Sequence, residues 1–237
     1  MSRRRTVTPE PTRSQTASVI AIDGPAASGK SAIGLALAAR LRYRFFDTGA
    51  MYRGVTWLAL QRGIDPNDAE ALGQLAVSVS IDVRDGNGGA VEPSGVLLDG
   101  EDATPHLREP AVEANVSLVS RVPRVRAALV RIQRDLASAG RVVMAGRDIG
   151  SVVLPDAGLK IYLDASREVR ARRRLEQLQR EGTQADFDEI LADLTRRDGI
   201  DESRATSPLT AAAGAEIINT DQLTIEEVVA RLLNLAA

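Results

Sequence analysis

Short apolar runs alternate with amphipathic segments along most of the chain. Segments with apolar residues three and four positions apart, such as Ile33, Leu37 and Leu41, indicate helices between or after the apolar runs. The runs with the length and composition of buried strands are 18–23, 43–46, 141–145, 159–163 and 215–219. This alternation predicts an α/β fold, in which a central five-stranded parallel sheet is flanked by helices on both faces.

One segment departs from this alternation. Apolar and polar residues alternate over residues 77–83, which is the pattern of a half-exposed strand. A glycine-rich turn at 85–89 and a second apolar run at 96–98 follow it. We therefore predict a small antiparallel insert at about residues 76–114. The core then comprises residues 18–75 and 115–237.

The first 17 residues are polar, contain two prolines and show no apolar periodicity. They predict a disordered arm over residues 1–17. Its basic, Ser/Thr-rich start is also typical of an organellar transit peptide, although Glu10 and the short length weigh against that alternative. No apolar run reaches the roughly 18 residues of a membrane helix. We expect a cytoplasmic monomer without a membrane partner.

Composition narrows the possible chemistry. The absence of cysteine excludes disulfides and cysteine nucleophiles, and a single histidine, His106, excludes a histidine-rich metal cage. The net charge of −2 argues against a surface that binds a nucleic-acid polymer. Only Lys30 and Lys160 among the 30 basic residues are lysines, so the remaining 28 are arginines.

A phosphate-binding pattern, G-x-x-x-x-G-K-[ST], lies between the first predicted strand and the following helix. Glycines let the backbone wrap so that its amides face phosphate oxygens, and the helix N-terminus adds positive charge. Lys30 is predicted to bridge the outer phosphates, and Ser31 to ligate Mg²⁺, which takes few protein ligands. The residues predicted to bind the nucleoside triphosphate are Gly24, Pro25, Ala26, Ala27, Ser28, Gly29, Lys30, Ser31 and Ala32.

The pattern alone does not separate kinases, GTPases and motor ATPases. The D-x-x-G and N-K-x-D strings of GTPases are absent, as is an apolar strand that ends in Asp-Glu. Arginines gather instead at 124–147, 170–174 and 196–204. Such clusters suit phosphoryl transfer between two phosphate-bearing substrates, because arginine binds phosphate bidentately and keeps its charge.

Three arginines of the second cluster share one helix face. Arg170, Arg173 and Arg174 lie at positions i, i+3 and i+4, where like charges repel unless an anion lies between them. We predict that they act in catalysis together with Lys30. Their helix would belong to a lid over about residues 167–204 that closes on the triphosphate and excludes water.

The chain resembles the bacterial cytidylate kinases, which are P-loop kinases of the nucleoside monophosphate kinase group. The matching stretches follow family order from about residue 18 to the end: IAIDGPAASGKS, FFDTGAMYRGVTWLAL, PRVRAALVRIQR, VVMAGRDIGSVVLPDAGLKIYLDAS, VRARRRLEQLQREG and TRRDGIDESRATSPLTAA. The resemblance implies Mg²⁺-dependent transfer of the terminal phosphoryl group of ATP to CMP or dCMP. It also implies an antiparallel insert that binds the monophosphate.

The resemblance further implies an acceptor site. The residues that match CMP-binding positions are Thr48, Arg53, Ser117, Arg126, Arg147, Asp148, Arg197, Asp201 and Arg204. Arg147 and Asp148 directly follow a buried strand, at the sheet edge where open α/β sheets bind ligands. A carboxylate at Asp148 suits cytosine because it accepts a hydrogen bond from the exocyclic amine. Arg126 matches the residue that donates to the cytosine ring, and Asp201 matches the sugar-hydroxyl acceptor.

Two alternatives remain open at this point. One is another P-loop kinase that acts on UMP, AMP or a non-nucleotide alcohol. The other is a P-loop module that binds a nucleotide without turnover. The pair of Arg126 and Asp148 favours the cytidylate kinase interpretation, because a non-nucleotide acceptor needs no residues that recognise cytosine.

Overall fold

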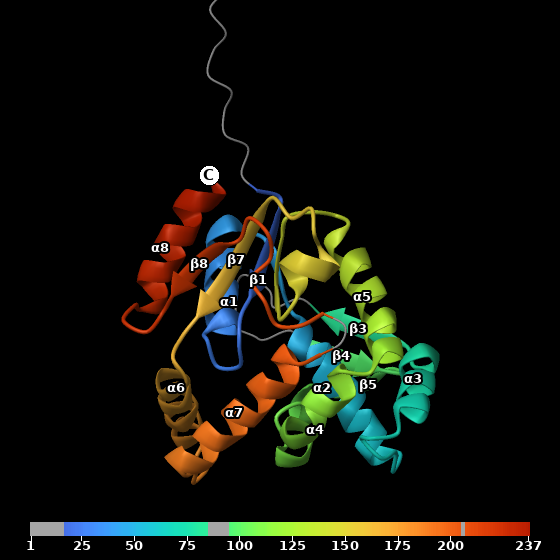
Figure 1. The fold of residues 1–237 in the computed structure, drawn as a ribbon. Coiled ribbons are helices and arrows are strands. Elements are labelled where there is room, and N and C mark those ends of the chain that lie inside the picture. The colour runs from blue at the N-terminus through green and yellow to red at the C-terminus, as the bar shows by residue number, and fades with distance from the viewer. Residues whose placement is uncertain (1–16, 85–94, 205–206) are drawn as a thin grey trace, which may run out of the picture.

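A parallel sheet of five strands forms the centre of the computed structural model, which describes residues 17–84, 95–204 and 207–237 (Figure 1). The strand order is β2 (Arg44–Asp47), β6 (Val142–Gly146), β1 (Val19–Asp23), β7 (Leu159–Asp164) and β8 (Glu216–Asn219). Each neighbouring pair is parallel. The predicted α/β fold and its five strands are confirmed.

Successive residues of each strand face opposite sides of the sheet, as the strand pleat requires. Val143 and Ala145 pack into an apolar cluster with α1 (Lys30–Leu41) and α8 (Ile225–Ala236). Val142 and Met144 face the opposite cluster. That second cluster includes residues of α5 (Pro123–Ala137) and of the short π-helix η2 (Ile149–Val153). The result is a sheet covered on both faces.

Local sequence features begin and end several helices. Thr224 and Glu227 form a capping box at the start of α8. Asp186 accepts backbone hydrogen bonds at the start of α7 (Phe187–Glu202). Gly182 has φ +75° and follows α6 (Arg167–Arg180), where a left-handed residue ends a helix.

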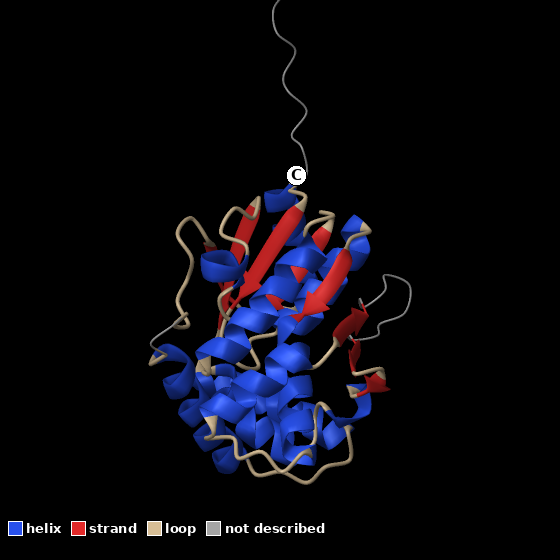
Figure 2. Cartoon of the chain, turned by 90° about the vertical axis from the view of Figure 1, so that its right-hand side faces the viewer, coloured by secondary structure: helices blue, strands red, loops and turns tan. Residues whose placement is uncertain are grey.

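A small antiparallel sheet lies beside the helices below the parallel sheet (Figure 2). It contains β3 (Ile81–Arg84), β4 (Gly95–Leu98) and β5 (Glu101–Asp102). The three strands fall inside the predicted insert, whose boundaries at 76 and 114 stay a prediction. The predicted turn at 85–89 lies outside the described residues, as do residues 1–16 of the predicted arm over 1–17; Ala17 itself donates to the carbonyl oxygen of Ala236 at 3.0 Å.

The first part of the predicted strand over 77–83 is wrong, because α3 (Ala69–Ser78) includes Val77. Asp68 caps this helix by accepting a hydrogen bond from the amide of Ala71. Alanine, leucine, glutamate and glutamine, which favour helices, make up most of α3. The helix therefore extends to Ser78, inside the segment where apolar and polar residues alternate. Val77 is 61% exposed, and extended backbone starts at Val79.

An apolar cluster connects the small sheet to the surrounding helices. It joins residues of α2 (Thr48–Gln61), α3, β4, α4 (Pro110–Ser120) and α5. Trp57 belongs to this cluster and stacks on His106 of the 3-10 turn η1 (Thr104–His106), with 4.9 Å between ring centroids. Trp57 is therefore a core residue. Within the described ranges, no helix is both long and apolar enough to cross a membrane.

Candidate site for phosphoryl transfer

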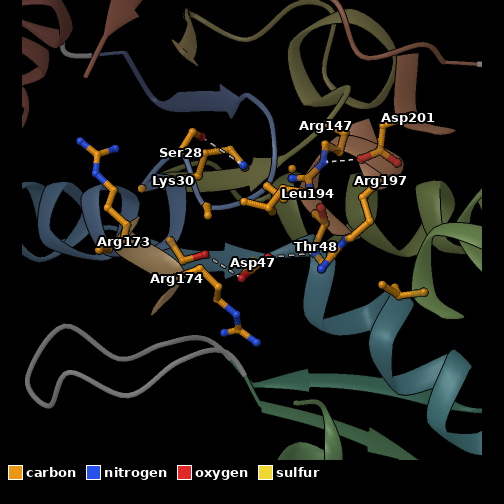
Figure 3. Close-up of a pocket in the computed structure, with 18 of the residues that line it drawn as sticks. Ser28, Lys30, Asp47, Thr48, Arg147, Arg173, Arg174, Leu194, Arg197 and Asp201 are labelled. Atoms are coloured by element: carbon orange, nitrogen blue, oxygen red, sulfur yellow. Dashed lines mark hydrogen bonds and ion pairs between the residues drawn. The ribbon is translucent and has the colours of Figure 1, made fainter. Parts of the chain in front are cut away.

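A cavity of about 650 Å³ opens where the P-loop, α2, α4, α6 and α7 meet. Figure 3 shows Lys30 and Asp47 between Arg173 and Arg174 on one side and Arg147, Arg197 and Asp201 on the other. Most of the residues predicted for the site line this cavity: Ala26, Ala27, Ser28, Gly29, Lys30, Ser31, Ala32, Thr48, Arg53, Ser117, Arg126, Arg147, Asp148, Arg173, Arg174, Arg197, Asp201 and Arg204. Gly24, Pro25 and Arg170 are not among the lining residues.

The backbone of the P-loop depends on glycine at two positions. Gly24 has φ +149°, and a Cβ atom there would lie 2.2 Å from the carbonyl oxygen of Leu163. Gly29 has φ +95° and directly precedes α1. These conformations turn the loop into the N-terminus of α1, where amide groups without helical partners can bind phosphate oxygens.

Lys30 lies inside this loop and is 8% exposed. Its Nζ donates to the carbonyl oxygen of Pro25 at 2.6 Å and is 3.4 Å from Oγ of Ser28. Burial, followed by the neighbouring Arg147, lowers the pKa of Lys30 well below its ordinary value. An anionic phosphate beside Nζ would oppose this shift, because an opposite charge favours the charged form.

Asp47 is a residue of the site that the sequence analysis did not single out. Its Oδ2 accepts a hydrogen bond from the hydroxyl of Ser31 at 2.8 Å, and its Oδ1 accepts one from the amide of Gly49. Burial acts to raise the pKa of Asp47, but Arg53 and the Ser31 hydroxyl lower it overall. The signal that could have found Asp47 is its position at the carboxyl end of β2, next to Thr48.

The residues predicted to recognise cytosine form a buried ion pair. Arg126 of α5 donates to the carboxylate of Asp148, which follows β6, and each side chain is 6% exposed. The guanidinium of Arg126 also lies over the ring of Tyr52, 5.7 Å from its centroid. Each partner therefore compensates the buried charge of the other, and together they form one polar wall of the cavity.

Asp201 joins two other arginines of the predicted acceptor site. Arg147 Nε donates to its Oδ2 at 2.8 Å, and Arg204 donates to its Oδ1. Arg204 also contacts Oγ of Ser120 at 2.8 Å. Burial acts to raise the pKa of Asp201, but Arg147 and Arg204 lower it overall. The carboxylate therefore stays ionised and keeps both guanidinium groups in place.

Glu113 of α4 lies between two arginines predicted for the acceptor site, and it is a second site residue that was not predicted from the sequence. Arg197 donates to Glu113 Oε2 at 2.9 Å, and Nε of Arg53 lies 4.0 Å from Oε1. These arginines outweigh the effect of burial and lower the pKa of Glu113. No sequence signal marks Glu113, because its partners lie 60 and 84 positions away.

Two smaller residues of the predicted acceptor site have simpler surroundings. Thr48 is the first residue of α2, and its hydroxyl donates to the carbonyl oxygen of Ala145 at 2.9 Å. This bond fixes Thr48 against the end of β6, beside the turn that carries Asp148. Ser117 is 4% exposed and lies on the α4 wall of the cavity.

The three arginines predicted for catalysis on α6 separate in the structure. Arg173 NH1 donates to the hydroxyl of Thr220 at 3.0 Å, and Arg174 NH1 donates to Gln177 at 3.1 Å. Both arginines line the cavity. Arg170 is 3% exposed and forms a bidentate pair with Asp198 of α7, with distances of 2.7 and 3.2 Å. The structure therefore brings only Arg173 and Arg174 to the cavity.

Arg170 also donates to backbone oxygens, those of Ala26 at 3.1 Å and Ala165 at 3.0 Å. It therefore connects α6, α7 and the P-loop. We expect Arg170→Ala to lower the free energy of unfolding by about 3–5 kcal/mol, because Asp198 would remain buried without its partner. Urea denaturation of the purified protein measures this change.

The exposed Arg172 provides a matched control on the same helix. Arg172→Ala should change stability by less than about 0.5 kcal/mol. If Arg170→Ala unfolds like the parent chain but loses activity, the residue acts in catalysis as the sequence predicts, and the structural role is wrong.

Comparisons with known proteins identify the family of the chain. The cytidylate kinase family matches residues 20–237. A cytidylate kinase from Pelotomaculum thermopropionicum is 49% identical over 210 residues, which cover 89% of this chain and 92% of the relative. One from Mycolicibacterium paratuberculosis is 47% identical over 220 residues, with coverage of 92% and 94%. A solved shikimate kinase from Bacteroides thetaiotaomicron has a TM-score of 0.46 at 15% identity, covering 92% of this chain and 97% of that one. The match to the family model and the two cytidylate kinases show that the chain belongs to the cytidylate kinase family.

Proposed function

We propose that the chain transfers the γ-phosphoryl group of ATP to CMP and dCMP, giving ADP together with CDP or dCDP. The observation that carries this proposal is the buried pair of Arg126 and Asp148 in the same cavity as the P-loop. A carboxylate accepts a hydrogen bond from the amine of cytosine, whereas uracil presents a carbonyl oxygen at that position. The cavity thus combines a donor site with side chains that suit a cytosine base.

The arginines support an in-line transfer in which a phosphate oxygen of CMP attacks the γ-phosphorus and the bond to ADP breaks. P-loop amides and Lys30 would bind the donor phosphates, and Arg53 and Arg147 would hold the acceptor phosphate. Arg173 and Arg174 would neutralise charge on the transferred group. The acceptor phosphate is already ionised at neutral pH, so positioning and charge neutralisation supply most of the catalysis.

The hydroxyl of Ser31 and the carboxylate of Asp47 fit a Mg²⁺ ion. Both are hard oxygen donors, and they lie 2.8 Å apart, with Ser31 at the start of α1 and Asp47 at the end of β2. Among the described residues, no group of three or more acidic, histidine or cysteine side chains is placed so that it could hold a metal ion. Two protein ligands suit Mg²⁺, which keeps several waters and binds phosphate oxygens. When bound, this ion neutralises charge on the β- and γ-phosphates.

A coupled assay of ADP formation with CMP, dCMP, UMP and AMP tests the proposal. We expect CMP or dCMP to give a kcat/KM roughly 5–150-fold above UMP and AMP, since a mispaired polar group in a binding site costs about 1–3 kcal/mol. Equal rates with all four monophosphates would overturn the substrate assignment. ADP formation without any acceptor dependence would favour an ATPase instead. The cytoplasmic location and the monomeric state stay predictions.

A further inference from the structure

Asp23 is the last residue of β1 and directly precedes the P-loop. Its side chain is buried, with 2% of the residue exposed. The carboxylate accepts two hydrogen bonds from backbone amides, one from Ile149 to Oδ1 at 2.7 Å and one from Gly150 to Oδ2 at 2.8 Å. Both oxygens of Asp23 therefore hold a segment that lies 126 and 127 positions further along the chain.

The two amides open η2 and directly follow Arg147 and Asp148. Amide groups at the start of a helix have no partner within it, so the Asp23 carboxylate supplies the missing acceptors. Arg147 forms a second link between the same segments, because its NH1 donates to the carbonyl oxygen of Gly24 at 3.2 Å. The start of the P-loop and the turn after β6 are thus joined by three hydrogen bonds.

Holding a carboxylate at this position is costly. Burial raises the pKa of Asp23 to about 6, against the lowering effect of the Gly150 and Ile149 amides. The nearby Asp148 raises it further, whereas Lys30 lowers it. A neutral side chain would avoid this cost, but only a carboxylate offers an acceptor oxygen to each of the two consecutive amides without a competing donor.

We propose that Asp23 is a positioning residue for the acceptor nucleotide. Its carboxylate fixes the turn after β6 so that Arg147 and Asp148 are directed at the acceptor phosphate and base, and it need not touch either substrate itself. Because β1 continues directly into the P-loop, the same residue sets the position of the acceptor site relative to the donor site. This inference rests on the acceptor site described under the proposed function.

The variant Asp23→Asn tests this role with a nearly unchanged shape. Its amide oxygen can accept from one backbone N–H, but its NH₂ group would face the other donor. We expect the Kd for CMP to rise at least tenfold, whereas the Kd for ATP should change less than threefold. Calorimetric titration with each nucleotide separately measures both values. Asp164→Asn, at the carboxyl end of the neighbouring strand β7, is the matched control and should leave both Kd values within threefold of the parent.

Hydrogen exchange gives a second readout on the folded protein. Amides 147–153 should exchange faster in Asp23→Asn, whereas those of α1 should not. Equal losses of affinity for CMP and ATP, or unchanged exchange at 147–153, would overturn the proposal even if the variant is less stable. Failure of the acceptor site itself is distinguishable: in that case Asp148→Ala would also leave CMP affinity unchanged.

Discussion

Lys30→Ala is expected to lower kcat for phosphoryl transfer by roughly 10²–10³-fold, the cost of removing one electrostatic group from a transition state. The Nζ of Lys30 lies within the P-loop, against the carbonyl oxygen of Pro25. A mobile ammonium in this position can follow the charge on the donor phosphates during transfer. Steady-state kinetics at saturating ATP and CMP measure the loss.

The two lysines of the chain allow a matched comparison with arginine. Lys30→Arg should also lose at least tenfold in kcat, because the planar guanidinium does not fit the space that the loop leaves for Nζ. Lys160→Arg, on β7, should retain kcat within about twofold. Full activity of Lys30→Arg would show that a positive charge alone suffices, contrary to this prediction.

Asp148→Ala is expected to lower kcat/KM for CMP by roughly 10²–10³-fold while intrinsic ATP hydrolysis changes by less than about threefold. Removing one member of a buried ion pair destabilises the protein by about 3–5 kcal/mol, because Arg126 would remain buried and charged without a partner. The carboxylate also supplies the acceptor for the cytosine amine. The coupled assay with and without CMP measures both activities.

Asp148→Asn separates recognition from stability. The amide keeps the size of the side chain, so the fold should be preserved better than in Asp148→Ala, and circular dichroism at increasing temperature would measure this. The ratio of kcat/KM for CMP to that for UMP should fall, since the amide can donate to the uracil carbonyl. Parallel loss of CMP turnover and ATP hydrolysis in both variants would mean that Asp148 supports the fold or the donor site instead.

Much of the fold follows from local sequence signals. The five strands are short apolar runs, and the P-loop has a fixed glycine spacing. Thr224 and Glu227 form the capping box that begins α8. Each of these features depends on neighbours within a few residues. The end of α3 at Ser78 is less visible in the sequence. Apolar and polar residues that alternate across the end of a helix resemble a strand, although the cap at Asp68 marks where the helix begins.

The parts of the site that escaped the sequence depend on distant partners. Asp47 belongs to the site because it accepts a hydrogen bond from the hydroxyl of Ser31. Asp23 is important because its carboxylate accepts hydrogen bonds from backbone amides in the turn after β6. Neither fact is visible before the strands are placed side by side. Arg170 and Arg173 lie three positions apart on one helix face, yet only Arg170 pairs with Asp198 of α7. Their spacing in the sequence therefore does not distinguish their surroundings.

Five arginines around the acceptor end of the cavity each have an internal counter-ion: Arg53, Arg126, Arg147, Arg197 and Arg204. Asp201 serves two arginines, Glu113 serves two more, and Asp148 serves Arg126. The guanidinium groups are therefore already ordered and partly stripped of water before any nucleotide arrives. An entering phosphate meets guanidinium groups that are already oriented, so the entropy of ordering these side chains is lost during folding and does not reduce affinity.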